Sequence, residues 1–160
     1  MKKAEGFLIS ISGGIEPRSK MPFSACELKT ALEAMLEQAP AGSSGSGDKV
    51  ALELALMTDE EISALNQQYL NCSGPTNILS FPAPKGHASV AGTPETLGWM
   101  ALSVDALRRE AVIYRQDLTE YSLSLLAHGL AHLCGYEHGE DMDTLAKKAT
   151  SAAKARLTGV

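Results

Sequence analysis

Apolar and polar residues alternate along two stretches of the chain, residues 6–12 and 50–57. A period of two places alternate side chains on opposite faces of an extended segment, so both stretches are predicted to be β-strands with one buried face. Two further apolar segments, 76–82 and 97–104, are also expected to be strands, and Pro82 ends the first of them. The side chains expected on the buried faces of the alternating strands are Phe7, Ile9, Ile11, Val50, Leu52, Leu54 and Leu56.

Between these strands, apolar residues recur at helical spacing. One helix is expected at about 23–38, and another starts at Thr58, with Glu61 three residues later as in a capping box. A third is expected after Ser103, which suits the N-cap position, and a last one, rich in Ala and Lys, at about 141–157. The apolar faces of the first and third helices are formed by Leu28, Leu32, Met35, Leu36, Val104, Leu107, Ala111 and Val112.

A further helix, predicted at about 118–134, differs because its apolar residues lie on nearly every side. A helix that is apolar all round is buried between other elements, so this one is expected to be central. Gly135 is predicted to end it, since glycine readily adopts the conformation that closes many helices. The apolar residues are Leu118, Tyr121, Leu123, Leu125, Leu126, Leu130 and Leu133.

The remaining segments are predicted to be loops. Residues 13–22 are rich in turn-forming residues, residues 39–49 are dense in Gly and Ser and are expected to be flexible, and a loop of small residues runs through 82–96. The chain has 160 residues, of which 44% are hydrophobic, enough for one domain with a proper core. Residues 1–160 are therefore assigned to a single domain.

Charge and cysteine content narrow the functional classes. The net charge of −5 argues against a strongly basic coat for nucleic acid, but it allows RNA binding through a local patch. Three scattered cysteines without a secretory signal indicate reduced thiols in the cytoplasm rather than a disulfide framework. No stretch approaches 18 consecutive apolar residues, so no membrane span is expected.

The central helix carries an unusual cluster of histidines. His128 and His132 are four residues apart, which separates their side chains by about 40° around the helix axis and about 6 Å along it. Gly135 lets the chain turn, so that His138 can return to the same point from outside the helix. Three imidazoles around one ion leave a fourth tetrahedral position for water, the arrangement of a catalytic zinc site.

Other interpretations of these residues stay open. A histidine in a core is often held by a hydrogen bond to its ring, and two histidines on a solvated helix face would be unremarkable. On a buried helix, however, imidazoles need compensation for lost water, which a metal provides. Cys134 is a possible rival ligand, although its position off the histidine face favours a small buried cysteine.

The histidine spacing is also that of the zincin motif H-E-x-x-H, but position 129 is glycine where metalloproteases carry their general base. A peptidase of that type is therefore not expected. Gly129 either leaves room beside the metal for a large substrate or meets a packing requirement of the helix, at a cost of about 1 kcal/mol in helix propensity relative to Ala.

Three segments resemble one protein family. "HGLAHLCGYEH" (128–138) resembles the H-G-x-x-H-x-x-G-Y-x-H signature of the YbeY-type zinc-dependent endoribonucleases, which act in ribosomal RNA maturation and ribosome quality control. "LNQQYLNCSGPTNILSFP" (65–82) and "LGWMALSVDALRREA" (97–111) are similar to two further segments of that family, in the same order. Together the three segments span residues 65–138, about half of the chain.

The resemblance implies an α+β fold, in which a small mixed β-sheet is packed with helices and a zincin-like metal-binding helix is central. It also implies that His128, His132 and His138 hold one Zn²⁺ per chain and that metal-activated water hydrolyses phosphodiesters in single-stranded RNA. The expected partners are ribosomal RNA and the ribosome or its small subunit, in the cytoplasm.

Further site residues are matched to the family segments or lie beside the histidines. Thr76, Asn77 and Ser80 are candidates for substrate binding, or they cap and bond the end of a strand. Glu137 is a candidate catalytic residue that orients a ligand or moves a proton. Glu137, Glu140 and Asp141 are candidate partners of the histidine rings, or they form a solvated acidic turn.

Two positions depart from the family pattern. Leu70 replaces an arginine that is associated with RNA processing, and Trp99 replaces an acidic residue, so both changes remove charge near the expected cleft. Lys85 could substitute for the arginine, and Trp99 either stacks on a base or fills the core. Two alternatives to the endoribonuclease therefore remain: a metal-stabilised, ribosome-associated binding protein with weak or lost catalysis, and a zinc hydrolase of another substrate.

Overall fold

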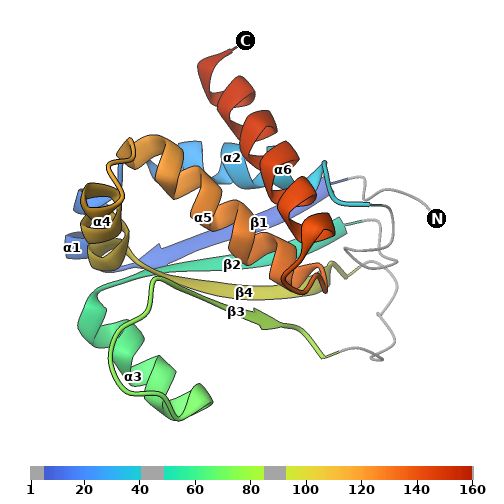
Figure 1. The fold of residues 1–160 in the computed structure, drawn as a ribbon. Helices are drawn as coiled ribbons and strands as arrows, with labels where there is room; N and C mark the ends of the chain where they lie inside the picture. The colour runs from blue at the N-terminus through green and yellow to red at the C-terminus, as the bar shows by residue number, and fades with distance from the viewer. Residues whose placement is uncertain (1–5, 41–48, 85–92, 160) are drawn as a thin grey trace.

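The structure is a computed structural model that describes residues 6–40, 49–84 and 93–159 (Figure 1). Within these ranges the chain forms four strands and six helices. The Gly/Ser-rich segment expected to be a flexible loop falls largely outside the described residues, as does Lys85. The elements are β1 Gly6–Gly13, α1 Ile15–Lys20, α2 Ala25–Leu36, β2 Lys49–Met57, α3 Asp59–Leu70, β3 Ile78–Pro82, β4 Glu95–Ser103, α4 Val104–Ile113, α5 Leu118–Leu133 and α6 Glu140–Thr158.

The strands form one mixed sheet in the order β1-β2-β4-β3. The strands β1, β2 and β4 are parallel, and β3 pairs antiparallel with β4, so β3 is an edge strand. This arrangement confirms the predicted α+β class with a small mixed sheet.

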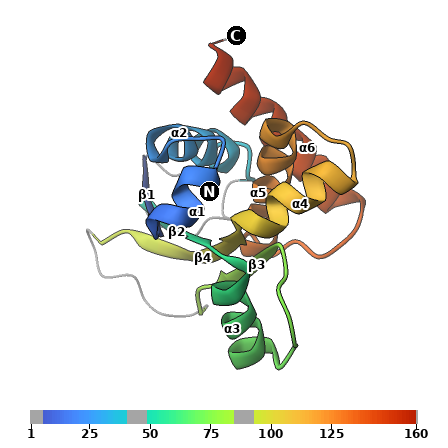
Figure 2. The same ribbon diagram turned by 90° about the vertical axis from the view of Figure 1, so that its left-hand side faces the viewer.

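Helices cover both faces of the sheet unequally (Figures 1 and 2). The helices α2 and α5 pack on one face, α6 lies across both of them as an outer layer, and α3 covers part of the opposite face. The helix α5 thus lies between the sheet and α6, which confirms the prediction that the all-apolar helix is central. None of the helices in the described ranges is long and apolar enough to cross a membrane.

The main core lies between the sheet and the α2–α5 layer. The alternating pattern of β2 places one set of apolar side chains in this core, while Glu53 on the other face is exposed. In β1, Ile9 is buried and its neighbour Leu8 is 52% exposed, as the period of two predicts. The residues of β2 and α2 predicted on buried faces, all 0–2% exposed, are Val50, Leu52, Leu54, Leu56, Leu28, Leu32, Met35 and Leu36.

Two predictions of local structure were wrong. Residues 13–22 were expected to be a loop, but they include the six-residue helix α1. The Arg18 guanidinium donates to the carbonyl oxygens of Gly13 at 3.0 Å and Ile11 at 2.9 Å. A residue distant in sequence also holds the helix, since Arg108 donates to the Lys20 carbonyl oxygen at 3.0 Å. Val112 was placed on the apolar face of α4, but it is 79% exposed, because it lies one residue beyond the buried stripe that ends at Ala111.

Candidate metal centre

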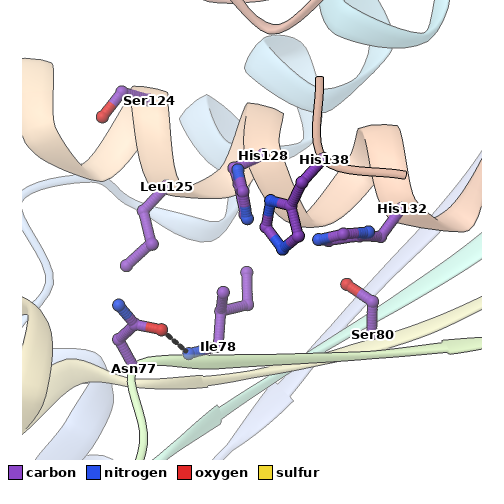
Figure 3. A pocket seen from close by; sticks show the side chains of 8 residues that line it. All are labelled: Asn77, Ile78, Ser80, Ser124, Leu125, His128, His132 and His138. Carbon is purple, nitrogen blue, oxygen red and sulfur yellow. Dashed lines mark hydrogen bonds between the residues drawn. The ribbon is translucent and has the colours of Figure 1, made fainter. Parts of the chain in front are cut away.

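The three predicted histidines converge on one point beside the sheet (Figure 3). His128 and His132 project from α5, and His138 comes from the turn before α6. Gly135 has a φ of +89° just after the helix, which turns the chain back as the sequence predicted. The ring centroids are 4.8 Å apart for His128–His132, 5.3 Å for His128–His138 and 4.9 Å for His132–His138.

The three imidazoles suit a metal ion. One ring nitrogen from each lies within 4.8 Å of the others. Zn–N bonds of about 2.0–2.1 Å in a tetrahedron require nitrogens roughly 3.3–3.4 Å apart, so small side-chain rotations bring this set into coordination distance. His128 and His132 are half-buried and His138 is exposed, so the point of convergence opens to solvent on one side. Three ring nitrogens with an open side match a site that keeps one coordination position free.

The lowered pKa of His128 also favours metal binding, which requires the neutral imidazole. Burial, followed by the neighbouring charges of His132 and His138, lowers the pKa of His128. Nδ1 of His132 lies 3.1 Å from the carbonyl oxygen of Tyr136. A proton on that Nδ1 makes the bond and leaves Nε2 free for a metal.

A hollow of about 500 Å³ lies in front of the histidines, between α5 and β3. Its described walls contain no lysine, arginine or carboxylate, so the histidines are the ionisable groups there. Apart from the histidines, the described side chains that line the hollow neither strongly attract nor strongly repel an anionic substrate. It is lined by Asn77, Ile78, Ser80, Ser124, Leu125, His128, His132 and His138.

Two of the three residues predicted to bind substrate, Asn77 and Ser80, line this hollow. Thr76 is half-buried next to Asn77 and is absent from the described lining. The Ser80 hydroxyl donates to the carbonyl oxygen of Gly129 at 2.8 Å, which ties β3 to α5. Ser80 therefore fits both expected roles, because it bonds a neighbouring element and also borders the histidine site.

Sequence reasoning missed the residues that hold Asn77. The Asn77 amide donates to Glu110 Oε2 at 3.1 Å, and the Tyr121 hydroxyl donates to the same oxygen at 2.5 Å. Burial and then the Glu110 carboxylate raise the pKa of Tyr121, so its phenol stays protonated as a donor. The one indication of this role in the sequence was the position of Glu110 at the end of the family-like segment 97–111. Its partners could not be identified because they are distant in sequence.

Gly129 is explained by packing. A Cβ built on Gly129 would lie 2.6 Å from Ile78 Cδ1, 3.0 Å from Met100 Sδ and 3.2 Å from Ser80 Oγ. A side chain at position 129 would therefore point at the sheet, and its absence allows α5 to approach β3 and β4 closely. Of the two interpretations of this glycine, the geometry supports the packing requirement rather than room for a substrate.

The acidic residues near His138 lie apart from the histidine hollow. Glu137, Glu140 and Asp141 are exposed and border a second, more open hollow that also includes His138. The described ring partner of His132 is instead the Tyr136 carbonyl. The catalytic role of Glu137 stays a prediction.

Cys134 is not grouped with the histidines in the described structure. Burial raises its thiol pKa to about 11, which disfavours the thiolate that binds metals. It packs against the main core, as the interpretation of a small buried cysteine predicted.

The two departures from the family pattern lie away from the histidine hollow. Trp99 faces the α3 side of the sheet, where its ring stacks on Phe81 with centroids 4.3 Å apart and Tyr69 contacts both rings edge-on. This placement supports the core-filling interpretation of Trp99. Leu70 is 53% exposed at the end of α3. The histidines belong to the opposite face, so neither residue lines the hollow that was expected beside them.

Comparisons with known proteins agree with this geometry. The family model described as Endoribonuclease YbeY matches residues 15–155. Curated proteins of that name include one from Nitratidesulfovibrio vulgaris, 43% identical over 67% of this chain and 74% of its own length, and one from Oleidesulfovibrio alaskensis, 39% identical over 84% of this chain and 88% of its own.

Among solved structures, a Thermotoga maritima protein determined in solution has a similar fold, with a TM-score of 0.61, 21% identity and coverage of 95% of this chain and 93% of its own. At that identity the likeness concerns the fold alone. The family match, however, spans all three segments that carry the resemblance and the three converging histidines. This chain belongs to the YbeY endoribonuclease family.

Proposed function

We propose that the protein is a zinc-dependent endoribonuclease that cleaves single-stranded RNA during ribosomal RNA maturation and ribosome quality control. The observation that carries the proposal is the convergence of His128, His132 and His138 beside an open hollow, in a chain whose relatives are named endoribonucleases. Three neutral imidazoles with an open side suit zinc at a hydrolytic site. One ion per chain follows from the one histidine group among the described residues.

The residues around the proposed ion would have different roles. When bound, Zn²⁺ lowers the pKa of water to about 7 and offsets negative charge on a phosphodiester. The three histidines would hold it, and the Tyr136 carbonyl fixes the orientation of the His132 ring. Asn77, held by Glu110, and Ser80 would contact the RNA from the opposite wall of the hollow. Glu137 would move a proton from the exposed turn beside His138.

The proposed partners are ribosomal RNA and the ribosome or its small subunit, because an endoribonuclease of this family acts on RNA. We place the protein in the cytoplasm, in agreement with the three free cysteines of the described residues. We also assign residues 1–160 to one domain, since the family match spans most of the chain.

The test is metal content together with RNA cleavage. Purified wild-type protein should contain about one zinc per chain and cleave a labelled single-stranded RNA, whereas His132→Ala should lose most of both, because two imidazoles bind zinc far more weakly than three. Cys26→Ser, an exposed change outside the site, is the control and should keep both properties. Equal, negligible zinc in wild type and His132→Ala would contradict the proposal.

One alternative is favoured by the absence of cationic side chains from the described walls of the hollow and by the hydrophobic Leu70. It is a metal-stabilised, ribosome-associated protein with weak or lost catalysis. Wild type that holds zinc and binds RNA without cleaving it would support this alternative. A zinc-loaded protein that instead hydrolyses a different class of polymer would identify a hydrolase of another substrate.

A further inference from the structure

The edge strand β3 borders the histidine hollow, and its hydrogen-bonding register can be assigned. Ser103 N donates to Asn77 O at 2.8 Å, and Ala83 N donates to Leu97 O at 3.0 Å. Bonded and non-bonded pairs alternate in an antiparallel ladder, so residues 77, 79, 81 and 83 point their backbone groups at β4. The N–H and C=O groups of the residues between them point away from the sheet.

The outward row consists of Ile78, Ser80 and Pro82. Pro82 has no N–H, which suits an outward position on an edge strand. The Ile78 N–H is already bonded to Asn77 Oδ1 at 2.7 Å. In the part of the chain that the structure describes, the Ser80 N–H has no acceptor, and it is the outward donor that remains on the row. The carbonyl oxygens of Ile78, Ser80 and Pro82 also point outward, beside this one N–H donor.

The outward row lies next to the histidines. The side chains of Ile78 and Ser80 line the hollow, and Figure 3 shows Ser80 directly across from His132. The bond from Ser80 Oγ to the Gly129 carbonyl fixes β3 against the metal-binding helix at this point. The free backbone edge is therefore held at a constant position relative to the point where the imidazoles converge.

The chemistry of the row suits a nucleic acid. Backbone N–H groups bind phosphate oxygens well, and the hollow has no described lysine or arginine that could do so instead. The outward carbonyl oxygens can accept from ribose 2′-hydroxyls or base amino groups. An extended peptide would be a poor occupant, because strand addition needs alternating donors and acceptors, and this row lacks two of its three donors.

We propose that the outward edge of β3 is a binding strip for single-stranded RNA, in which the Ser80 backbone N–H donates to a phosphate oxygen and the carbonyls of Ile78, Ser80 and Pro82 accept from the sugar or base. This inference rests on the proposed endoribonuclease function and specifies how the protein binds its substrate at a hollow whose described walls carry no lysine or arginine. It gives the backbone of Ser80 a role separate from that of its hydroxyl.

A matched pair of variants isolates the N–H. Ser80→Ala removes the hydroxyl and its bond to Gly129 but keeps the N–H, whereas Ser80→Pro removes both and is compatible with an outward edge position. With a labelled single-stranded RNA as substrate, kcat/KM of Ser80→Pro should fall about ten- to hundredfold below that of Ser80→Ala, the size expected for one hydrogen bond to a charged group. Zinc content should be equal in both variants.

Equal kcat/KM for the two variants would overturn the inference while leaving the endoribonuclease function intact. The inference would also be overturned if wild type cleaved an unstructured peptide and Ser80→Pro lost that activity. The ligand of the β3 edge would then be a peptide and not RNA. Wild type that cleaves no RNA would instead defeat the proposed function, and the inference is then decided by direct binding.

Direct binding also covers the case in which Ser80→Pro does not fold. In metal-free, ¹⁵N-labelled wild-type protein, the Ser80 amide should exchange rapidly with solvent and become protected when single-stranded RNA is added. The Leu79 amide, which points at β4, should be protected throughout and serves as the internal control. An unchanged Ser80 amide at saturating RNA would contradict the proposal.

Discussion

At the scale of single residues, the site depends on small side chains as much as on the histidines. His128 and His132 point to one place because of their spacing on α5. Ser80 and Ile78 form the opposite wall of the hollow because α5 lies close to the sheet. Gly129, between the two histidines in sequence, permits that approach. Its role is testable separately from the chemistry of the metal.

We predict that Gly129→Ala changes the free energy of unfolding by less than about 1 kcal/mol, because the better helix propensity of Ala offsets the displacement of the flexible Ile78 side chain. Gly129→Val adds bulk against Met100 and Ser80 and should lower stability by about 1–3 kcal/mol. Urea unfolding measures both changes. The control is Thr119→Val on an exposed turn of α5, where a change within about 0.5 kcal/mol is expected.

A Gly129→Val variant as stable as wild type would contradict the packing explanation. Gly129 would then be explained by the space that it leaves for substrate. In that case the variant should lose activity without losing stability.

At the scale of secondary-structure elements, the N-terminus of α4 is fixed by a buried polar contact that also holds α3. Ser103 is fully buried, and its hydroxyl accepts from Ala106 N at 3.1 Å and donates to Asp59 Oδ1 at 2.8 Å. The Arg109 guanidinium bonds the same carboxylate, and this contact, together with that of Ser103, lowers the pKa of Asp59. One serine thus caps α4 and joins α3 to the end of β4.

Ser103→Ala should therefore lower the free energy of unfolding by about 1–3 kcal/mol, because it removes a helix cap and leaves a partly buried carboxylate with one donor fewer. Ser24→Ala, at the exposed capping box of α2, is the matched control and should cost about 1 kcal/mol. Urea unfolding at neutral pH compares the two. An equal or smaller loss for Ser103→Ala would contradict the linking role.

The sign of the pH dependence follows from the lowered pKa of Asp59. Its contribution to stability is present above the unfolded pKa of about 3.9 and is lost as the pH falls through the lower folded pKa. Ser103→Ala removes one cause of the lowering, so in urea unfolding from neutral to acid pH the variant should lose less stability to acid than wild type, and the loss should be complete at a higher pH.

At the scale of the whole molecule, the histidines join two layers. His128 and His132 belong to the central helix α5, and His138 lies in the turn that leads into the outer helix α6. The helix α6 also packs across α2 and α5. A bound ion would therefore stabilise the folded chain as a whole, since the unfolded chain holds no preformed site.

We predict that zinc raises the thermal midpoint of the wild-type protein. At free zinc a hundredfold above Kd, the stabilisation is about 2.7 kcal/mol, which corresponds to a rise of about 5–10 °C for a chain of this length. Thermal unfolding followed by circular dichroism, with and without added zinc, measures the shift. His138→Ala should show little shift, and an equal shift in both proteins would indicate that the ion binds elsewhere.

Much of the fold was predictable because its signals are local. Alternation in residues 50–57 identified a strand with one buried face, and the all-apolar pattern of 118–134 identified the central helix. The histidine cluster was predictable for the same reason, since the spacing of His128 and His132 on one helix fixes their relative direction. Family-like segments then added the class of fold and the expected substrate.

Other features depended on contacts between residues that are far apart in sequence. Glu110 holds Asn77 only because α4 returns to the start of β3, and the Ser80 N–H points away from the sheet only because β3 is the edge strand. Strand order decides such contacts, and periodicity within one segment carries no information about it. The sequence by itself determined which histidines form a cluster that could hold a metal ion, and the tertiary structure decided which backbone and side-chain groups face them.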